Sequence, residues 1–215
     1  MIHVVTAANR HLYAACLERL FALRAEGLEG EAAFAPGVRQ TDAYDNDDAV
    51  YLLALEGECV VGGHRLTPTL KPTMLGDLFP QLAAVRGVPE DAGVWEWSRR
   101  FVARDRRDGR LDLAFMTAVQ ELGLEEGLTA LSAVVETWWL PRFQDAGFAV
   151  RPLGLPAFVH GRWRMAALIT VRGQSLDCVK QQAGIYGSVL VRRGPQRPLV
   201  NDKDVSERRI MGATI

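Results

Sequence analysis

The stretch VWEWSRRFVARDRRDGRLD, residues 94–112, places a carboxylate in the middle of an aromatic run that has the composition of a β-strand. Side chains alternate between the two faces of a strand, so Trp95, Trp97 and Arg99 share one face of a regular strand while Glu96 lies on the other. A charge is costly to bury without a partner. The face that carries Glu96 is therefore predicted to be wet, or to meet cations or a ligand.

Outward from this stretch, apolar periodicity and turn signals predict strands and helices in mixed order. The predicted strands cover residues 1–7, 49–57, 58–68, 94–102, 128–137 and 163–171, and the predicted helices cover residues 9–28, 111–127, 140–146 and 175–190. This order predicts an α/β fold, a three-layer α-β-α sandwich with a central mixed, mostly antiparallel sheet. No GxGxxG or GxxxxGK[ST] motif follows a strand, so binding of a nucleotide by those motifs is unsupported.

The chain length limits the number of domains. With 215 residues, of which 48% are hydrophobic and 24% charged, the chain is long enough for one sizeable core. We expect one domain over residues 1–172, and a C-terminal helix and polar tail over residues 173–215 that is part of this domain or appended to it. Residues 27–46, rich in glycine and acidic side chains, are predicted to form an irregular loop of the kind that lines sites.

Charge and cysteine usage exclude several classes of protein. The 25 basic and 26 acidic residues give a net charge of -1, so no global field recruits nucleic acid. No signal peptide or apolar run long enough to span a membrane is recognised, and a cytoplasmic location is expected. The three cysteines and four histidines are scattered without metal-ligand spacing, so no metal is expected.

Several charged residues occur where a packed core does not need them. They are Arg24 at the end of the first helix, Asp42 and Asp45 before a strand, Arg65 in GGHRLTP, and Glu96 with Arg99 in the aromatic strand. Each has an ordinary structural explanation: Arg24 as a solvated cation at a helix end, the aspartates as turn residues, and Arg65 as an exposed strand charge. Their combination favours a functional site.

In these motifs the chain resembles the acyl-homoserine-lactone synthases of bacterial quorum sensing, which share a fold with the GNAT acetyltransferases. The resemblance runs over residues 1–172. It rests on four segments in the same order: Asp-Ala-Tyr-Asp at 42–45 before a strand, GGHRLTPT at 62–69, MLGDLFPQL at 74–82, and Glu-Trp-Ser-Arg-Arg-Phe at 96–101. The last has one more residue before its phenylalanine than the family pattern.

The resemblance implies a GNAT-like fold and transfer of an acyl group from coenzyme A or acyl carrier protein to the amine of S-adenosylmethionine. Lactone closure then expels methylthioadenosine. S-adenosylmethionine and the acyl donor are substrates, and no permanently bound cofactor is implied. Glu96, Arg99 and Arg24 are the expected catalytic residues, with Glu96 taking the proton of the amine directly or through water. The expected S-adenosylmethionine site consists of Arg24, Leu28, Phe34, Asp42, Asp45, Arg65, Arg99 and Phe101.

The alternation of side chains raises a difficulty, because Glu96 and Arg99 have opposite parity. A β-bulge between them restores a common face, and bulges are frequent beside active sites. We therefore predict a bulge near Ser98 or Arg99. If the strand is regular, Arg100 joins Glu96 instead.

The acyl donor is expected at the basic segment that follows this strand and at a tryptophan pair. Guanidinium groups beside a helix N-terminus suit a phosphate of coenzyme A, and an acidic carrier protein suits the same patch; a solvated basic loop is the alternative. Two indoles near the expected acyl pocket favour a short, branched or aromatic acyl group, although paired tryptophans are often core residues. The expected residues are Arg100, Arg104, Arg106, Arg107, Gly109, Arg110, Thr137, Trp138 and Trp139.

The chain departs from the family at two aromatic positions of the S-adenosylmethionine pocket. Leu28 and Phe34 stand where the family has phenylalanine and tryptophan. An aromatic ring contributes contact with an adenine or a sulfonium, which leucine does not. This departure favours one alternative, a GNAT-like N-acyltransferase that uses another amine. A non-catalytic homologue that binds an acyl carrier or a regulator is a separate alternative, against which the presence of Glu96 with Arg24, Asp45 and Arg65 argues.

Overall fold

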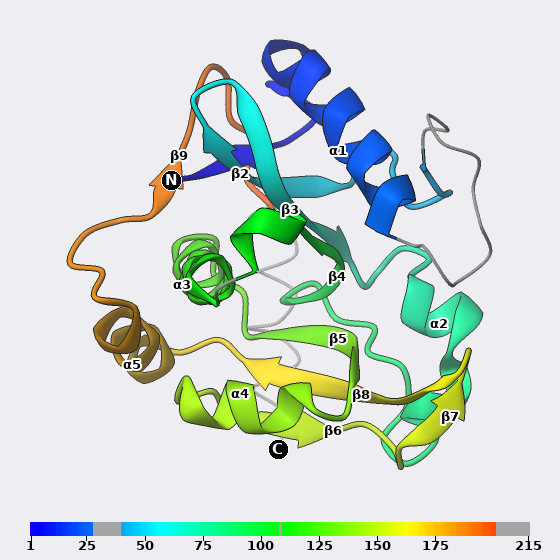
Figure 1. The fold of residues 1–215 in the computed structure, drawn as a ribbon. Helices are drawn as coiled ribbons and strands as arrows, with labels where there is room; N and C mark the ends of the chain where they lie inside the picture. Colours follow the sequence, from blue (N-terminus) through cyan, green and yellow to red (C-terminus); the bar gives the residue numbers. More distant parts are fainter. Residues whose placement is uncertain (28–39, 108, 201–215) are drawn as a thin grey trace.

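The computed structural model describes residues 1–27, 40–107 and 109–200 (Figure 1). The strands are β1 (Ile2–Val5), β2 (Val50–Glu56), β3 (Cys59–Pro68), β4 (Val94–Val102), β5 (Ala130–Glu136), β6 (Val150–Pro152), β7 (Ala157–Val159), β8 (Arg162–Thr170) and β9 (Leu190–Val191). The helices are α1 (Ala14–Gly27), α2 (Met74–Leu78), α3 (Arg110–Glu125), α4 (Trp139–Asp145) and α5 (Gly173–Ala183), with short 3₁₀ turns η1 (Arg10–Tyr13), η2 (Pro80–Ala83) and η3 (Arg104–Arg106).

The strands form one sheet in the order β6-β8-β5-β4-β3-β2-β1-β9, with β7 paired to β8. The β4–β5 and β1–β9 pairs are parallel and the other pairs are antiparallel. The prediction of a mixed, mostly antiparallel sheet is thereby confirmed.

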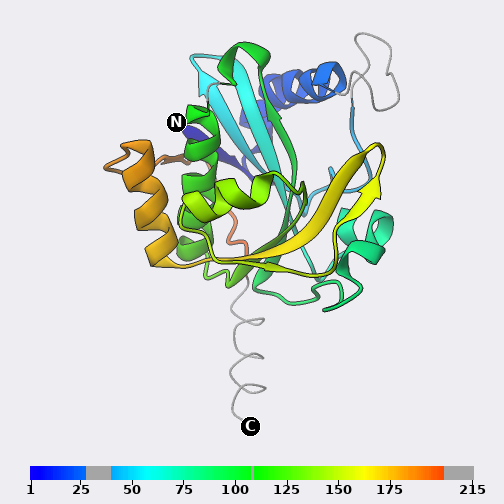
Figure 2. The same cartoon turned by 60° about the horizontal axis from the view of Figure 1, so that its bottom comes forward.

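Helices cover both faces of this sheet, as alternate residues of β2 demonstrate. Tyr51 and Leu53 pack in a cluster with the buried side of α1, whereas Leu52 and Ala54 pack in the cluster that contains Phe115 of α3. Figure 2 shows α3, α4 and α5 on one side of the strands, and α1 and α2 on the other. The three-layer arrangement is therefore confirmed; below, the two sides are called the α1 face and the α3 face.

Strands β4 and β5 diverge soon after they begin. They pair only over Val94–Glu96 and Ala130–Ser132, although β4 continues to Val102 and β5 to Glu136. Beyond these residues β4 stays on β3, and β5 stays on β8. The sheet therefore has a slot between the two strands, and Glu96 is the last paired residue of β4 at its closed end.

A β-bulge interrupts β4 on the open side of this slot. Ser98 pairs with Arg65 and Phe101 with Gly63, so two residues of β4 stand opposite one residue of β3. Arg99 adopts a left-handed conformation with φ of 54°, which is uncommon for a side chain of this size. The predicted bulge is confirmed.

The C-terminal segment differs from its prediction in two ways. The predicted helix ends at Ala183, because Gly184 takes the left-handed conformation (φ 66°) that closes many helices. Leu190, the last residue of the predicted helix, and Val191 after it form β9 instead, which pairs with β1 at the sheet edge. Since α5 also packs on α3, we infer that residues 173–200 are part of the same domain as the residues before them.

Among the described residues, no helix is both long enough and apolar enough to cross a membrane. In the same part of the chain, no three His, Cys, Asp or Glu side chains are grouped so that they could hold a metal ion.

Candidate active site

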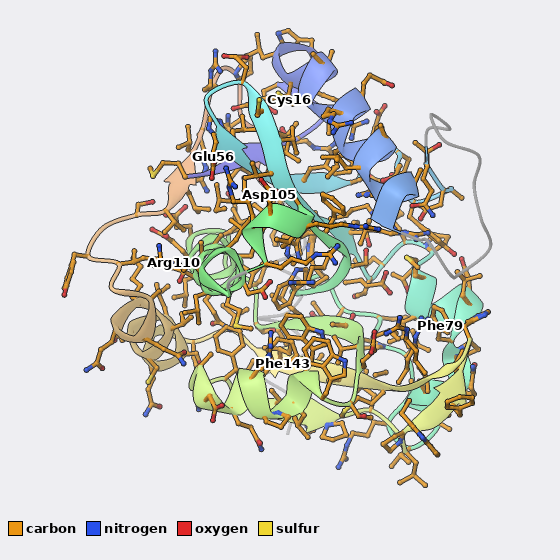
Figure 3. The ribbon with its side chains drawn as sticks, viewed as in Figure 1. Cys16, Glu56, Phe79, Asp105, Arg110 and Phe143 are labelled. Carbon is orange, nitrogen blue, oxygen red and sulfur yellow. The ribbon has the colours of Figure 1, made fainter. Side chains whose placement is uncertain are left out.

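A cavity of about 300 Å³ passes through the slot between β4 and β5. On the α1 face its lining includes Glu96, Ser98, Met74 and Phe79, whereas on the α3 face it includes Trp97, Met116, Trp139 and Phe143. Figure 3 shows Phe79 beside α2 and Phe143 at α4. The cavity therefore joins a polar compartment on one face of the sheet to an apolar pocket on the other.

Glu96 lies where the two compartments meet. Its side chain is 1% exposed, and its two carboxylate oxygens accept the backbone N–H groups of Met74 (3.1 Å) and Leu75 (2.7 Å) at the start of α2. Burial raises the pKa of Glu96 above its ordinary value, against the two N–H donors, which lower it. The result is a fixed carboxylate beside the cavity that binds a proton more readily than an exposed glutamate.

An ionic network occupies the α1 face beside Glu96. Asp45 accepts hydrogen bonds from Arg24 (3.0 and 3.1 Å) and forms an ion pair with Arg65 (2.9 Å). Asp42 accepts from Arg65 (2.5 Å) and Arg99 (2.8 and 2.5 Å). The bulge at Arg99 makes this last contact possible, since it turns the side chain to the face that Glu96 and Ser98 share.

Burial decides between the interpretations of these charges. Arg24 is 5% exposed and Arg65 is 0% exposed, so the alternatives of a solvated helix-end cation and an exposed strand charge are wrong. Asp42 does also act as a turn residue, because it accepts the N–H of Tyr44 (2.9 Å). Although burial opposes it, the arginines hold the pKa values of Asp42 and Asp45 below the ordinary range.

Arg24 has hydrogen-bonding capacity that the described residues do not use. Its Nε and one of its two terminal nitrogens are buried and have no partner within this part of the chain. Arg24 also lines a second cavity of about 530 Å³. This cavity shares Met74, Arg99 and Arg100 with the first, and Phe101 contributes to its wall.

Arg100 faces the other way from Arg99, toward the α3 face. It donates to Asp112 of α3 and lies over the ring of Trp139, 4.7 Å from its centroid. Asp112 also lies 3.7 Å from Arg142 of α4. The three charged residues connect β4, α3 and α4 at the mouth of the slot.

The basic segment after β4 divides into residues at the second cavity and residues away from it. Arg107 lines that cavity and donates to the carbonyl of Val102 (3.0 Å). Arg106 instead binds Glu56 of β2 and Asp105 of η3, which are labelled close to each other in Figure 3. Of the other expected residues in this segment, Arg104 is in η3, Gly109 precedes α3 with φ of 86°, and Arg110 begins α3.

The two tryptophans have different surroundings. Trp139 is 8% exposed, belongs to the core and lines the first cavity, so both interpretations of it apply. Trp138 is 48% exposed, stacks on Trp139 with 4.9 Å between ring centroids, and lines the second cavity. Thr137, just before them, donates its N–H to the carbonyl of Trp163 and is not among the residues that line either cavity.

Leu28 and Phe34 lie outside the described residues. The structure instead brings in residues that the sequence did not single out: His64, Phe79, Asp112, Phe143 and Arg164 line the first cavity. Tyr44 contacts the ionic network, since the guanidinium of Arg65 lies over its ring, 5.5 Å from the centroid. Its hydroxyl donates to Asp77 of α2 (2.9 Å), and burial with this carboxylate raises the pKa of Tyr44 to about 12. MLGDL, residues 74–78, was a recognisable motif, but its N–H contacts with Glu96 depend on tertiary packing.

The chain also matches a known protein family. The model of the autoinducer synthase family matches residues 9–177. The chain belongs to this family. As an autoinducer synthase it is an acyl-homoserine-lactone synthase, which confirms the function that the sequence motifs implied.

Relatives of this autoinducer synthase match over most of its length. The isovaleryl-homoserine lactone synthase of Bradyrhizobium diazoefficiens is 54% identical over 200 residues, 91% of each chain. Two structures of BjaI, a CoA-dependent acyl-homoserine lactone synthase, one with S-adenosylmethionine and isopentyl-CoA and one with methylthioadenosine, each match with a TM-score of 0.88, 50% identity, and coverage of 98% of this chain and 99% of that one.

More distant structures show the likeness of fold alone. FeeM, an N-acyl amino acid synthase from uncultured soil microbes, matches this autoinducer synthase with a TM-score of 0.52 at 13% identity, over 81% of this chain and 93% of that one. An N-acetyltransferase structure from Lactobacillus plantarum matches with a TM-score of 0.55 at 16% identity, over 80% of this chain and 99% of that one, so the GNAT-like fold expected from the sequence is confirmed.

Proposed function

We propose that this acyl-homoserine-lactone synthase takes a short acyl group from coenzyme A rather than from acyl carrier protein. The cavity through the slot carries the proposed joining of a charged amino acid to an acyl group, since it joins an ionic compartment to an apolar pocket. A charged amino acid suits the first compartment and an acyl chain suits the second. The CoA-dependent relative with bound S-adenosylmethionine and isopentyl-CoA supports this assignment. We also infer a cytoplasmic location, where both substrates are made.

Glu96 has the position that the acylation step needs. The amine nitrogen attacks the thioester carbon, the C–S bond breaks, and the thiolate leaves while Glu96 takes the proton of the amine. In the second step a carboxylate oxygen attacks the carbon bonded to the sulfonium, that C–S bond breaks, and neutral methylthioadenosine leaves. Glu96 borders both compartments, which supports its role as base.

The ionic network is our proposed site for the amino-acid part of S-adenosylmethionine. The buried, unpartnered donors of Arg24 suit its carboxylate, and Arg99 lines both cavities. Asp42 and Asp45 hold these cations together with Arg65. Phe101 contributes to the wall of the second cavity. Leu28 and Phe34 complete the proposed site on the sequence resemblance alone.

The donor is proposed to enter across the mouth of the slot. Arg100 and Arg107 line the second cavity together with Trp138, which favours phosphate contacts there. Four further residues are kept in the proposed donor site because of their position along the chain: Arg104, Gly109, Arg110 and Thr137. Arg106 is the weakest member of the set, because two carboxylates already occupy its guanidinium.

The acyl group is proposed to be short and branched. Trp139 and Phe143 line the apolar part of a cavity of only about 300 Å³. The relative from Bradyrhizobium diazoefficiens makes isovaleryl-homoserine lactone, which fits this limit.

Product analysis tests these proposals directly. Purified protein is incubated with S-adenosylmethionine and either isovaleryl, butyryl, hexanoyl or octanoyl coenzyme A, and the lactone and methylthioadenosine are measured by mass spectrometry. We expect isovaleryl-homoserine lactone and methylthioadenosine in equal amounts. A product only with acyl carrier protein contradicts the donor assignment. An acylated product only with amines other than S-adenosylmethionine contradicts the acceptor.

A second prediction concerns pH. Both the amine of S-adenosylmethionine and Glu96 must lose a proton before acylation. For S-adenosylmethionine, log(kcat/KM) is therefore expected to fall with a slope of 1 below the pKa of this amine, about 8. The slope steepens to 2 below the pKa of Glu96. Because burial raises that pKa, the steeper part begins above the ordinary glutamate value of about 4.3. Circular dichroism at each pH confirms folding, and a slope that stays at 1 down to that value contradicts the assignment.

A further inference from the structure

His64 is an enclosed imidazole at the wall of the apolar pocket. It lies on β3, opposite the bulge of β4, and its ring packs against Phe115 of α3 with 4.1 Å between centroids. The side chain is 1% exposed and lines the first cavity together with Trp97. Histidine at this point is therefore part of the α3 face, separate from the ionic network on the α1 face.

The partner of the ring determines its tautomer. The indole Nε1–H of Trp97 donates to Nδ1 of His64 at 2.5 Å, and an indole nitrogen is only a donor, so Nδ1 must carry a lone pair. Burial, with a smaller contribution from Arg100, lowers the pKa of His64 well below its ordinary value. The ring is therefore neutral, with its proton on Nε2.

This arrangement is energetically unfavourable for a residue that only fills space in the core. Nε2 is buried and has no hydrogen-bond partner among the described residues. An unsatisfied buried donor is unfavourable, whereas an apolar side chain of similar size at the same place avoids that loss. Within the described part of the chain, the one polar contact of the His64 ring is the bond that orients Trp97.

The bond fixes the orientation of the Trp97 side chain, which borders the cavity. Its indole lines the cavity on the α3 face and lies 6.0 Å from Phe143, measured between ring centroids. Glu96 and Ser98, its neighbours along β4, face the opposite compartment. Rotation of the indole therefore changes the shape of the apolar pocket and leaves the ionic network in place.

We propose that His64 is a positioning residue that sets acyl selectivity by holding the Trp97 indole as one wall of the acyl pocket. The proposal rests on the proposed function, since it takes the apolar compartment as the acyl site. Under this proposal, the residue at position 64 must provide one thing, a hydrogen-bond acceptor for the indole N–H of Trp97.

Three variants test this requirement. His64→Leu removes the acceptor, His64→Gln keeps an acceptor in a side chain of similar reach, and Trp97→Phe removes the donor. For each we measure Kd for isovaleryl and hexanoyl coenzyme A by calorimetry, and kcat/KM for both donors with KM for S-adenosylmethionine. We expect His64→Leu to reduce the preference for the favoured donor about tenfold, a size typical of pocket-shape effects. His64→Gln keeps the preference within about threefold, and KM for S-adenosylmethionine stays within about twofold in both.

The double variant His64→Leu/Trp97→Phe separates positioning from general packing. If His64 acts through the indole bond, adding His64→Leu to Trp97→Phe changes the preference no further. An unchanged preference in His64→Leu overturns the proposal, as does an equal loss in His64→Gln. If His64→Leu fails to fold, Trp97→Phe and His64→Gln test the same bond from its two ends.

Different results contradict the proposed function and the role of His64. Absence of lactone from the wild-type chain with every donor overturns the proposed function, and the Kd values still report on His64. Active wild-type protein with the same donor preference in all variants overturns only the role of His64.

Discussion

The Glu96→Gln variant is expected to fold like the parent chain and to lose turnover by a factor of about 100 or more. The amide oxygen can still accept one of the two N–H groups of α2, but a neutral amide cannot take a proton from the attacking amine. The measurement is kcat with isovaleryl coenzyme A, together with the thermal midpoint of unfolding. The loss is expected in kcat rather than in KM, because Glu96 accepts the proton of the attacking amine and does not contribute to substrate affinity.

Glu121→Gln is the matched control for this variant. Glu121 is also a buried carboxylate that accepts a backbone N–H, from Val189 at 3.1 Å, but it lies on α3 outside the lining of both cavities. Its replacement therefore removes the same kind of group without affecting turnover. Near-normal kcat in Glu96→Gln removes Glu96 from the role of base, and a similar loss in both variants points to damage of the fold.

The Asp45→Asn variant is expected to lower the free energy of unfolding by about 3–5 kcal/mol, the typical effect of removing one partner of a buried ion pair. Asp45 is the shared acceptor of Arg24, Arg65 and the hydroxyl of Tyr51 (2.9 Å), and its side chain is 2% exposed. Neutralising it leaves two buried guanidinium groups with one carboxylate fewer. Denaturant unfolding measures the effect.

Asp47→Asn provides the comparison, because the side chain of Asp47 is 91% exposed and pairs with Arg10 at the surface. A change of less than about 1 kcal/mol is expected there. Equal effects of the two substitutions contradict the importance of the network.

Acid provides an independent test of the same ion pairs. The arginines depress the pKa values of Asp42 and Asp45 in the folded protein, so their stabilisation is fully present above the unfolded value of about 3.9. It is lost as pH falls through the lower folded values. In Asp45→Asn this loss is expected to be smaller than in the parent chain.

Local patterns in the sequence were sufficient for most of the elements. Alternation along residues 94–102 placed Glu96 away from the tryptophans, and the parity conflict with Arg99 located the bulge. The short strands β6, β7 and β9 and the slot were not predicted, because they are set by contacts between distant segments. The strand Leu190–Val191 is two residues long and exists through its pairing with β1, and the slot depends on where β4 and β5 stop pairing.

The charged residues of the site could be predicted from the sequence, but their partners in space could not. Motifs identified the arginines and aspartates of the network, whereas the partners of Glu96 are backbone groups of α2, which no residue type reveals. Arg106 illustrates the opposite error. Its position in a basic cluster suggested a phosphate contact, but Glu56, 50 residues away in sequence, pairs with it in the fold.

The slot between β4 and β5 has a consequence for how such an enzyme diversifies. Because the two compartments lie on opposite faces of the sheet, substitutions on α3 and α4 can reshape one without moving the arginines and aspartates of the other. A bacterial lineage can then change the chemical identity of its signal while the reaction that makes it stays the same.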